Sequence, residues 1–238
     1  MTGFAEIWAY LADAPLLWLA ATLAAYAAGE TANRWAGRSP IVNPVLCAVA
    51  ILGLALWVTG TPYSAYFEGA QFVHFMLGPA TVCLAVPLFR NRALARRAIL
   101  PILAALLAGS VTAMVSALAI ARALGVDKTM LLSLAPKSAT APVAMGVAER
   151  LGGSPTLTAV LVIATGIAGA VMATPLLDAM GIRDWRARGF AVGVASHGIG
   201  TARAFEVHET AGAFAGLGMG LNALLTALLA PWIASMFL

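Results

Sequence analysis

The sequence contains very little charge. Only 10% of its 238 residues are Asp, Glu, Lys or Arg, whereas 61% are hydrophobic. A soluble domain carries about 25% charged residues, so a chain of this composition could not cover its surface in water. Four stretches without any charged residue are each long enough for a membrane-spanning helix: 69–89, 98–121, 151–177 and 210–238. The sequence therefore predicts an all-α, polytopic membrane helical bundle, with residues 1–238 forming a single integral membrane domain.

The sequence also lacks the residue patterns that are typical of enzymes and of cofactor or metal sites. The two cysteines, Cys47 and Cys83, lie in apolar stretches, where a small buried side chain is the better interpretation. There is no P-loop, no Rossmann fingerprint and no deep carboxylate that could orient a Ser–His pair. The N-terminus carries Glu6 and Asp13 instead of the basic start of a signal peptide. We therefore expect no enzyme, no cofactor and no metal site, and the net charge of +4 does not suggest nucleic-acid binding.

Eight apolar segments can be recognised: 14–29, 42–59, 69–89, 98–123, 129–149, 155–178, 189–206 and 210–238. Basic clusters between the segments, the strongest of them Arg90, Arg92, Arg96 and Arg97, are expected on the cytoplasmic side. If both segments between residues 129 and 178 crossed, Arg183, Arg186 and Arg188 would fall on the opposite side. If one of these two segments does not cross the membrane, all the basic clusters lie on the cytoplasmic side. Segment 129–149 is the natural candidate, as a re-entrant hairpin or a broken helix.

Lys137 lies in the middle of segment 129–149, between Pro136 and Pro142. A lysine at membrane depth costs about 2.5–3.5 kcal/mol, and both prolines disturb helical hydrogen bonding. These costs are tolerable where protein or water lines a cavity. A broken helix also exposes backbone N–H groups that favour an anion, and Ser138 and Thr140 add hydroxyl groups. The alternative is a proline-kinked helix in which Lys137 is neutral or bonded to a carbonyl group.

Segment 189–206 is short and rich in glycine. It contains a second candidate motif: Ser196, His197, Gly198, Ile199, Gly200, Thr201, Ala202 and Arg203. Glycines allow close backbone approach, His197 can bind or move a proton, and Arg203 can clamp a carboxylate with two donors. The alternatives are a structural buried histidine and an interfacial arginine that pairs with Glu206.

Short segments interrupted by glycine or proline, such as 129–149 and 189–206, indicate a transporter site. Residues 77–81 echo residues 134–138, which could reflect an inverted repeat, and Pro79 and Thr81 could break segment 69–89 and line the same cavity. Asn43, before Pro44, could be a polar helix-breaking element or, as we favour, the start of a helix. The GxxxG patterns of Gly212, Gly216 and Gly220 indicate close helix packing or the face of a homodimer.

No Asp or Glu lies as deep in an apolar segment as Lys137, since Glu30, Glu68, Glu149, Asp178 and Glu206 all lie at segment edges. Lys137 therefore lacks an obvious protein counter-ion, and an anionic ligand could fill that role. A cation transporter would be expected to show intramembrane carboxylates, and this sequence has none.

Together these motifs resemble the LrgB/CidB family of bacterial membrane proteins, over roughly residues 40–235. The resemblance rests on Asn43-Pro44, on Leu77-Gly78-Pro79-Ala80-Thr81 with Leu84-Ala85-Val86-Pro87-Leu88, on Pro136-Lys137-Ser138 with Thr140 and Pro142, and on the motif from Ser196 to Arg203. Ala139 and Ala141 stand where many members have Val and Thr, which removes one hydroxyl group from the candidate site.

The resemblance implies a multi-pass protein of the bacterial cytoplasmic (inner) membrane. Members were first described as holin- or antiholin-like modulators of murein hydrolases and cell lysis, beside a small LrgA/CidA partner. A plant chloroplast relative exchanges glycolate and glycerate, and bacterial relatives have been linked to pyruvate uptake. A holin-like pore would need no dedicated cation pocket, so the charges favour a secondary transporter of small monocarboxylates. We expect Lys137, Ser138, Thr140 and the backbone near Gly198–Thr201 to contact the carboxylate, with a proton or cation as the coupling ion.

Overall fold

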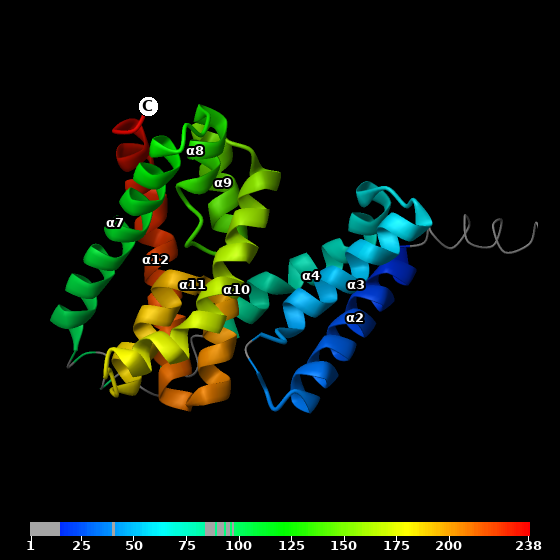
Figure 1. Cartoon of the computed structure of the whole chain (residues 1–238), viewed down its shortest axis with the longest axis horizontal. Helices are drawn as coiled ribbons and strands as arrows, with labels where there is room; N and C mark the ends of the chain where they lie inside the picture. The colour runs from blue at the N-terminus through cyan, green and yellow to red at the C-terminus, as the bar shows by residue number, and fades with distance from the viewer. Residues whose placement is uncertain (1–14, 40, 84–88, 90–92, 94–95, 97) are drawn as a thin grey trace, which may run out of the picture. The chain divides into compact units, whose positions relative to one another are not determined.

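The computed structural model of the chain describes residues 15–39, 41–83, 89, 93, 96 and 98–238. Every regular element among these residues is a helix (Figure 1), so the predicted all-α class is confirmed. The helices form two compact units, residues 1–83 and 84–238. Several residues of the sequence prediction lie outside the described part: Glu6, Asp13, the 84–88 motif, Arg90, Arg92 and Arg97.

The first unit contains α2 (Pro15–Trp35), α3 (Pro44–Thr59) and α4 (Tyr63–Cys83). α3 begins at Asn43, whose side-chain oxygen accepts hydrogen bonds from the N–H groups of Val45 and Leu46. Pro44 occupies the first helical position, where its missing N–H has no cost. Of the two interpretations of Asn43, the helix start is confirmed and the helix-breaking element is wrong.

Pro79 and Thr81 both lie within α4, which continues to Cys83. The predicted break at residues 77–81 is therefore wrong. A proline removes one bond from the helical ladder, but Pro79 lies on an exposed face of the helix, and the remaining bonds maintain the helix on both sides of it.

The second unit contains α7 (Ile99–Ala123), α8 (Lys128–Leu134), α9 (Ala141–Leu151), α10 (Pro155–Ala179), α11 (Trp185–Val207) and α12 (Glu209–Ser235). Among the described residues, α7, α10 and α12 are long and apolar enough to cross a membrane. The 25 residues of α7 or α10 extend about 37 Å at 1.5 Å per residue, which exceeds a hydrocarbon core of about 30 Å. These helices confirm a membrane-type protein.

Segment 129–149 is broken, as predicted, and it folds back on itself. α8 ends at Leu134, and α9 starts only at Ala141. The N–H of Ser154, which follows α9, donates to the hydroxyl of Ser133 at 2.8 Å, and the Thr158 hydroxyl donates to the Ser133 carbonyl at 3.0 Å. The chain therefore returns to the end of α8 after α9. We name α8, residues 135–140 and α9 hairpin one, with residues 135–140 as its tip.

α11 is also broken. It turns at His197, whose φ of 41° and ψ of −134° are not helical. The ring of Trp185, at the start of α11, stacks on the ring of His208, just past its end, with 4.8 Å between centroids. A straight helix of 23 residues would separate its two ends by about 33 Å. Residues 185–207 therefore form hairpin two, with residues 196–198 as its tip.

α10 links the open ends of the two hairpins. It begins at Pro155, beside the end of hairpin one, and ends at Ala179, shortly before hairpin two. Since α10 is about 37 Å long, the hairpins enter the unit from opposite ends and their tips point inward. In Figure 1, α8 and α9 accordingly lie beside the upper ends of α7 and α10, and α11 lies toward their lower ends.

Candidate functional site

The tip of hairpin one carries Lys137. Two tight backbone turns shape it, since the Lys137 N–H donates to the Leu134 carbonyl at 3.1 Å and the Ala139 N–H to the Pro136 carbonyl at 2.9 Å. Pro136 is fully buried, whereas Lys137 is half-buried. The Lys137 Nζ lies 3.4 Å from the Ser138 hydroxyl, to which it donates. A cation and a hydroxyl group therefore stand together on a backbone without helical bonding.

The first turn of α9 has no side-chain cap. Thr140 occupies the N-cap position, but its side chain accepts no bond from the helix, and Pro142 lies in the first turn. The N–H groups of the first turn have no partner inside a helix, and the helix dipole adds positive potential there. Hairpin one thus directs backbone donors toward the same region as Lys137.

The tip of hairpin two carries Ser196 and His197, which are 1% and 4% exposed. The His197 Nε2 lies 2.8 Å from the Val162 carbonyl oxygen. Because a carbonyl oxygen can only accept, Nε2 carries the hydrogen, and in a neutral ring Nδ1 is then the acceptor. The positive φ of His197 is strained for a residue with a side chain, at about 1–3 kcal/mol. The structure therefore holds this ring in place at some cost.

Two glycines of α10 leave the space that the side chains of this tip occupy. A Cβ on Gly166 would lie 2.6 Å from the His197 Cε1 and 2.9 Å from its Nε2, and a Cβ on Gly169 would overlap the Ser196 side chain. Because these glycines have no side chains, the His197 ring can reach the Val162 carbonyl. The sequence prediction missed both glycines, although small residues three apart in Gly166-Ile167-Ala168-Gly169 indicate a close approach.

The other motif residues shape the second half of hairpin two, residues 199–207, which we call its returning limb. A Cβ on Gly200 would lie 2.5 Å from the Ser196 Cβ, and the Thr201 hydroxyl donates to the His197 carbonyl at 2.7 Å. Gly198 has more space, since a Cβ there would meet only the Met219 Sδ, at 3.9 Å. The motif from Ser196 to Thr201 is therefore mainly buried, with Gly198 at its more open point.

Asn222 of α12 connects the two hairpins. Its Nδ2 donates to the Ser138 carbonyl at 2.9 Å and to the Val194 carbonyl at 3.1 Å, and its Oδ1 accepts from the Ser110 hydroxyl of α7 at 2.5 Å. Through these bonds Asn222 holds Ser138, next to Lys137, and Val194, three residues before His197, so the two motifs lie in the same inner region.

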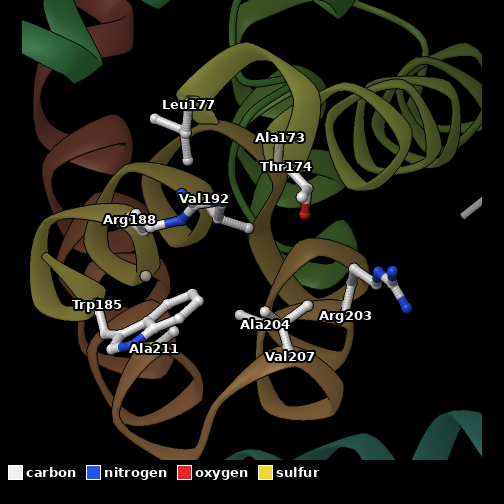
Figure 2. Close-up of a pocket in the computed structure, with 11 residues that line it drawn as sticks. Ala173, Thr174, Leu177, Trp185, Arg188, Val192, Arg203, Ala204, Val207 and Ala211 are labelled. Atoms are coloured by element: carbon white, nitrogen blue, oxygen red, sulfur yellow. The ribbon is translucent and has the colours of Figure 1, made fainter. Parts of the chain in front are cut away.

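Arg203 lies away from both tips. It stands on the returning limb six residues past His197, about 9 Å along the helix axis, and its Nη1 donates to Glu206 at 2.8 Å. It borders a cavity of about 20 Å³ with Trp185 and Arg188, and its guanidinium points away from that cavity (Figure 2). The pairing with Glu206 is the interfacial alternative for this residue.

The charges of the described residues leave Lys137 without an acidic partner. Four ion pairs occur in this part of the chain, namely Arg34–Glu30, Arg186–Asp184, Arg188–Asp178 and Arg203–Glu206. Lys137 belongs to none of them. The same residues contain no group of three or more His, Cys, Asp or Glu placed to hold a metal ion.

Comparison with known proteins places the chain in a family. Residues 22–236 match the model of the LrgB-like family. The chain is 34% identical to a holin-like protein CidB of Staphylococcus epidermidis over 200 residues, which cover 84% of this chain and 87% of the relative. It is 36% identical to the Bacillus subtilis protein YxaC over 198 residues, 83% of this chain and 86% of the relative. No solved structure matches. The resemblance found in the sequence is confirmed, and the chain belongs to the LrgB-like family.

Proposed function

We propose that this chain is a multi-pass secondary transporter of small monocarboxylates, such as pyruvate, glycolate or glycerate, in the bacterial cytoplasmic membrane. The position of Lys137 supports this most strongly. Its ammonium group stands at a break in the chain, beside the uncapped first turn of α9, and joins none of the ion pairs of the described residues. A ligand carboxylate would supply the missing negative charge.

Hairpin one offers several donors to a carboxylate. We assign to it the Lys137 Nζ, the hydroxyls of Ser138 and Thr140, and the N–H groups that begin α9. Bonds from a charged donor are about twice as strong as neutral ones, so Lys137 would contribute most. One unpaired cation matches one carboxylate, which favours monocarboxylates over dicarboxylates.

Hairpin two would complete the site from the opposite side, through Ser196, Gly198, Gly200, Thr201 and the His197 ring. Because Nε2 is bonded to Val162, the Nδ1 is the atom that could take up and release a coupling proton. Arg203, also expected among the substrate contacts, is not assigned to the site, because its bond to Glu206 supports the interfacial alternative.

The arrangement of the hairpins supports alternating access. Broken helices that meet inside the bundle are common in transporters built from inverted repeats. In each half of the second unit, a long helix precedes a hairpin: α7 before hairpin one and α10, of opposite direction, before hairpin two. Movement of one hairpin would open the site to one side of the membrane only. The end that carries Arg183, Arg186 and Arg188 would face the cytoplasm.

A holin-like pore is the second candidate, and the names of the staphylococcal relatives favour it. This function would involve a small LrgA/CidA-like partner or several copies of the chain. Gly212 packs under the Phe205 ring of the same chain, whereas a Cβ on the exposed Gly220 would meet nothing within 4 Å. A homodimer would therefore use the Gly220 side of α12.

The deciding experiment is uptake of labelled pyruvate and glycolate by proteoliposomes. Lys137→Ala should abolish uptake, because the charge opposite the carboxylate is removed. The sequence has only one other lysine, Lys128, which is exposed at the start of α8. Lys128→Ala is therefore a matched control and should transport like the wild type.

Uptake by Lys137→Ala at the wild-type rate would refute the proposed site. A wild-type protein that releases unrelated solutes as fast as monocarboxylates would instead support the holin-like pore. Uptake of dicarboxylates at the same rate as monocarboxylates would contradict the assigned substrate class.

A further inference from the structure

Asn222 is 1% exposed, and its carboxamide makes three hydrogen bonds to three other elements. Its two N–H groups donate to the Ser138 and Val194 carbonyls, and its oxygen accepts from the Ser110 hydroxyl. Because carbonyl oxygens can only accept, the site requires a side chain with two hydrogens and one acceptor. Among side chains of this size only Asn offers that set.

The two carbonyl groups belong to the stretches where the helical bonding stops. Ser138 lies in the break between α8 and α9. Val194 stands three residues before the turn at His197. In a continuous helix its carbonyl would accept from the N–H group four residues later, but that group lies beyond the turn. Asn222 therefore supports both broken segments, one residue from Lys137 and three from His197.

We infer that Asn222 is the positioning residue of the site, and that its carboxamide couples the tip of hairpin one to the tip of hairpin two. Both carbonyl oxygens lie within 3.1 Å of one nitrogen atom. Neither tip can move away from α12 without breaking one of these bonds, so the two tips loosen together when the shared group is lost. The consequence for transport rests on the proposed function, but the coupling itself does not.

Two substitutions separate the coupling from general stability. Asn222→Asp keeps the size of the side chain and the oxygen that accepts from Ser110, but a carboxyl group has at most one hydrogen for two carbonyls. Ser110→Ala removes the bond to Oδ1 and leaves both bonds to the tips. The first variant breaks the coupling, and the second tests the same buried network without breaking it.

The measurement is backbone hydrogen exchange, by mass spectrometry, of the purified full-length chain. Asn222→Asp should exchange faster than the wild type both at residues 135–140 and at residues 194–198, and Ser110→Ala at neither. Faster exchange at only one tip, at neither, or equally in both variants would overturn the coupling. If Asn222→Asp does not fold, Asn222→Ser replaces it, since its one hydroxyl hydrogen also cannot serve two carbonyls.

Transport kinetics provide the second measurement. Asn222→Asp should raise KM for pyruvate about tenfold, because the donors at Lys137 and Ser138 are misplaced, whereas Ser110→Ala should change KM less than about twofold. Equal KM values for the two variants would overturn the positioning role. If the wild type takes up no monocarboxylate, the proposed function fails, and the exchange comparison still decides the coupling.

Discussion

The His197 ring donates from Nε2 to the carbonyl oxygen of Val162, 2.8 Å away. The ring can reach this atom because Gly166, one helical turn along α10, has no side chain. The histidine is buried and adopts a positive φ, so the contact fixes both its orientation and the nitrogen that carries the hydrogen. A glycine therefore controls the geometry of the candidate site through the side chain that it lacks.

Gly166→Ala should displace the His197 ring, since the new Cβ would lie 2.6 Å from its Cε1. Overpacking of this kind costs about 1–3 kcal/mol, and the bond to Val162 would be lost. We expect a lower unfolding temperature in detergent and a marked loss of uptake.

Gly220→Ala is the matched control, because a Cβ there would meet nothing within 4 Å. Alanine is favoured over glycine in a helix by about 1 kcal/mol, so this variant should be as stable as the wild type or more stable. Equal loss of stability in the two variants would show that Gly166 is not needed to leave space for the His197 ring.

Local chemistry made the two chain breaks predictable. Pro136 and Pro142 flank Lys137 within seven residues, and the glycines around His197 weaken its helix, so both breaks can be inferred from neighbouring residues. Pro79 shows the limit of this inference, because α4 passes through it without interruption. A proline shows where a helix is weakened, but the surrounding structure decides whether it ends.

A re-entrant course was one of the two expectations for segment 129–149, but the fold-back of hairpin two and the contacts that hold both hairpins could not be predicted. The fold-back of each hairpin depends on contacts such as Ser133 with Ser154 and Trp185 with His208, which no periodic pattern encodes. Asn222 bonds to a residue 84 positions away, and in the sequence it is one polar residue in an apolar helix. The sequence therefore indicated the two motifs of the site, but it did not indicate that Asn222 connects them.

Arg203 should prove to be a partner of Glu206 rather than of the substrate. Their side chains are 18% and 30% exposed at 2.8 Å, and a pair of this kind contributes about 0–1 kcal/mol. Arg203→Ala and Glu206→Ala should lower the unfolding temperature slightly and equally, and the double variant should add nothing further. A large rise in KM for pyruvate in Arg203→Ala alone would show that Arg203 contacts the substrate after all.

Asp184 should stabilise the start of hairpin two over most of the pH range. It caps α11, and its pKa lies at about 2, because the Arg186 side chain and backbone N–H both donate to its carboxylate. A folded-state pKa below the unfolded value of about 3.9 means that this stabilisation is full above pH 4 and disappears as the pH falls toward 2.

Replacing Asp184 by Ala should cost about 1 kcal/mol at pH 7, the usual effect of removing a cap. Asp184→Asn keeps a capping oxygen and should cost less. The difference between the wild type and Asp184→Asn, measured by thermal unfolding in detergent, should vanish between pH 4 and 2. A difference that stays constant over this range would mean that the carboxylate charge adds no stability.

The path of the chain can be tested by labelling single cysteines in a chain that carries Cys47→Ser and Cys83→Ser. Four exposed positions suit this test: Lys128, Glu149, Arg183 and Glu209. In intact cells an impermeant maleimide should label cysteines at 128 and 149, and should reach those at 183 and 209 only after the membrane is permeabilised. The reason is that each hairpin returns to the end from which it entered, so α10 alone separates residue 149 from residue 183. Labelling of 128 and 149 from opposite sides would require hairpin one to cross, and labelling of 183 and 209 from opposite sides would require hairpin two to cross. Either result would contradict the arrangement in which the tips meet at Asn222.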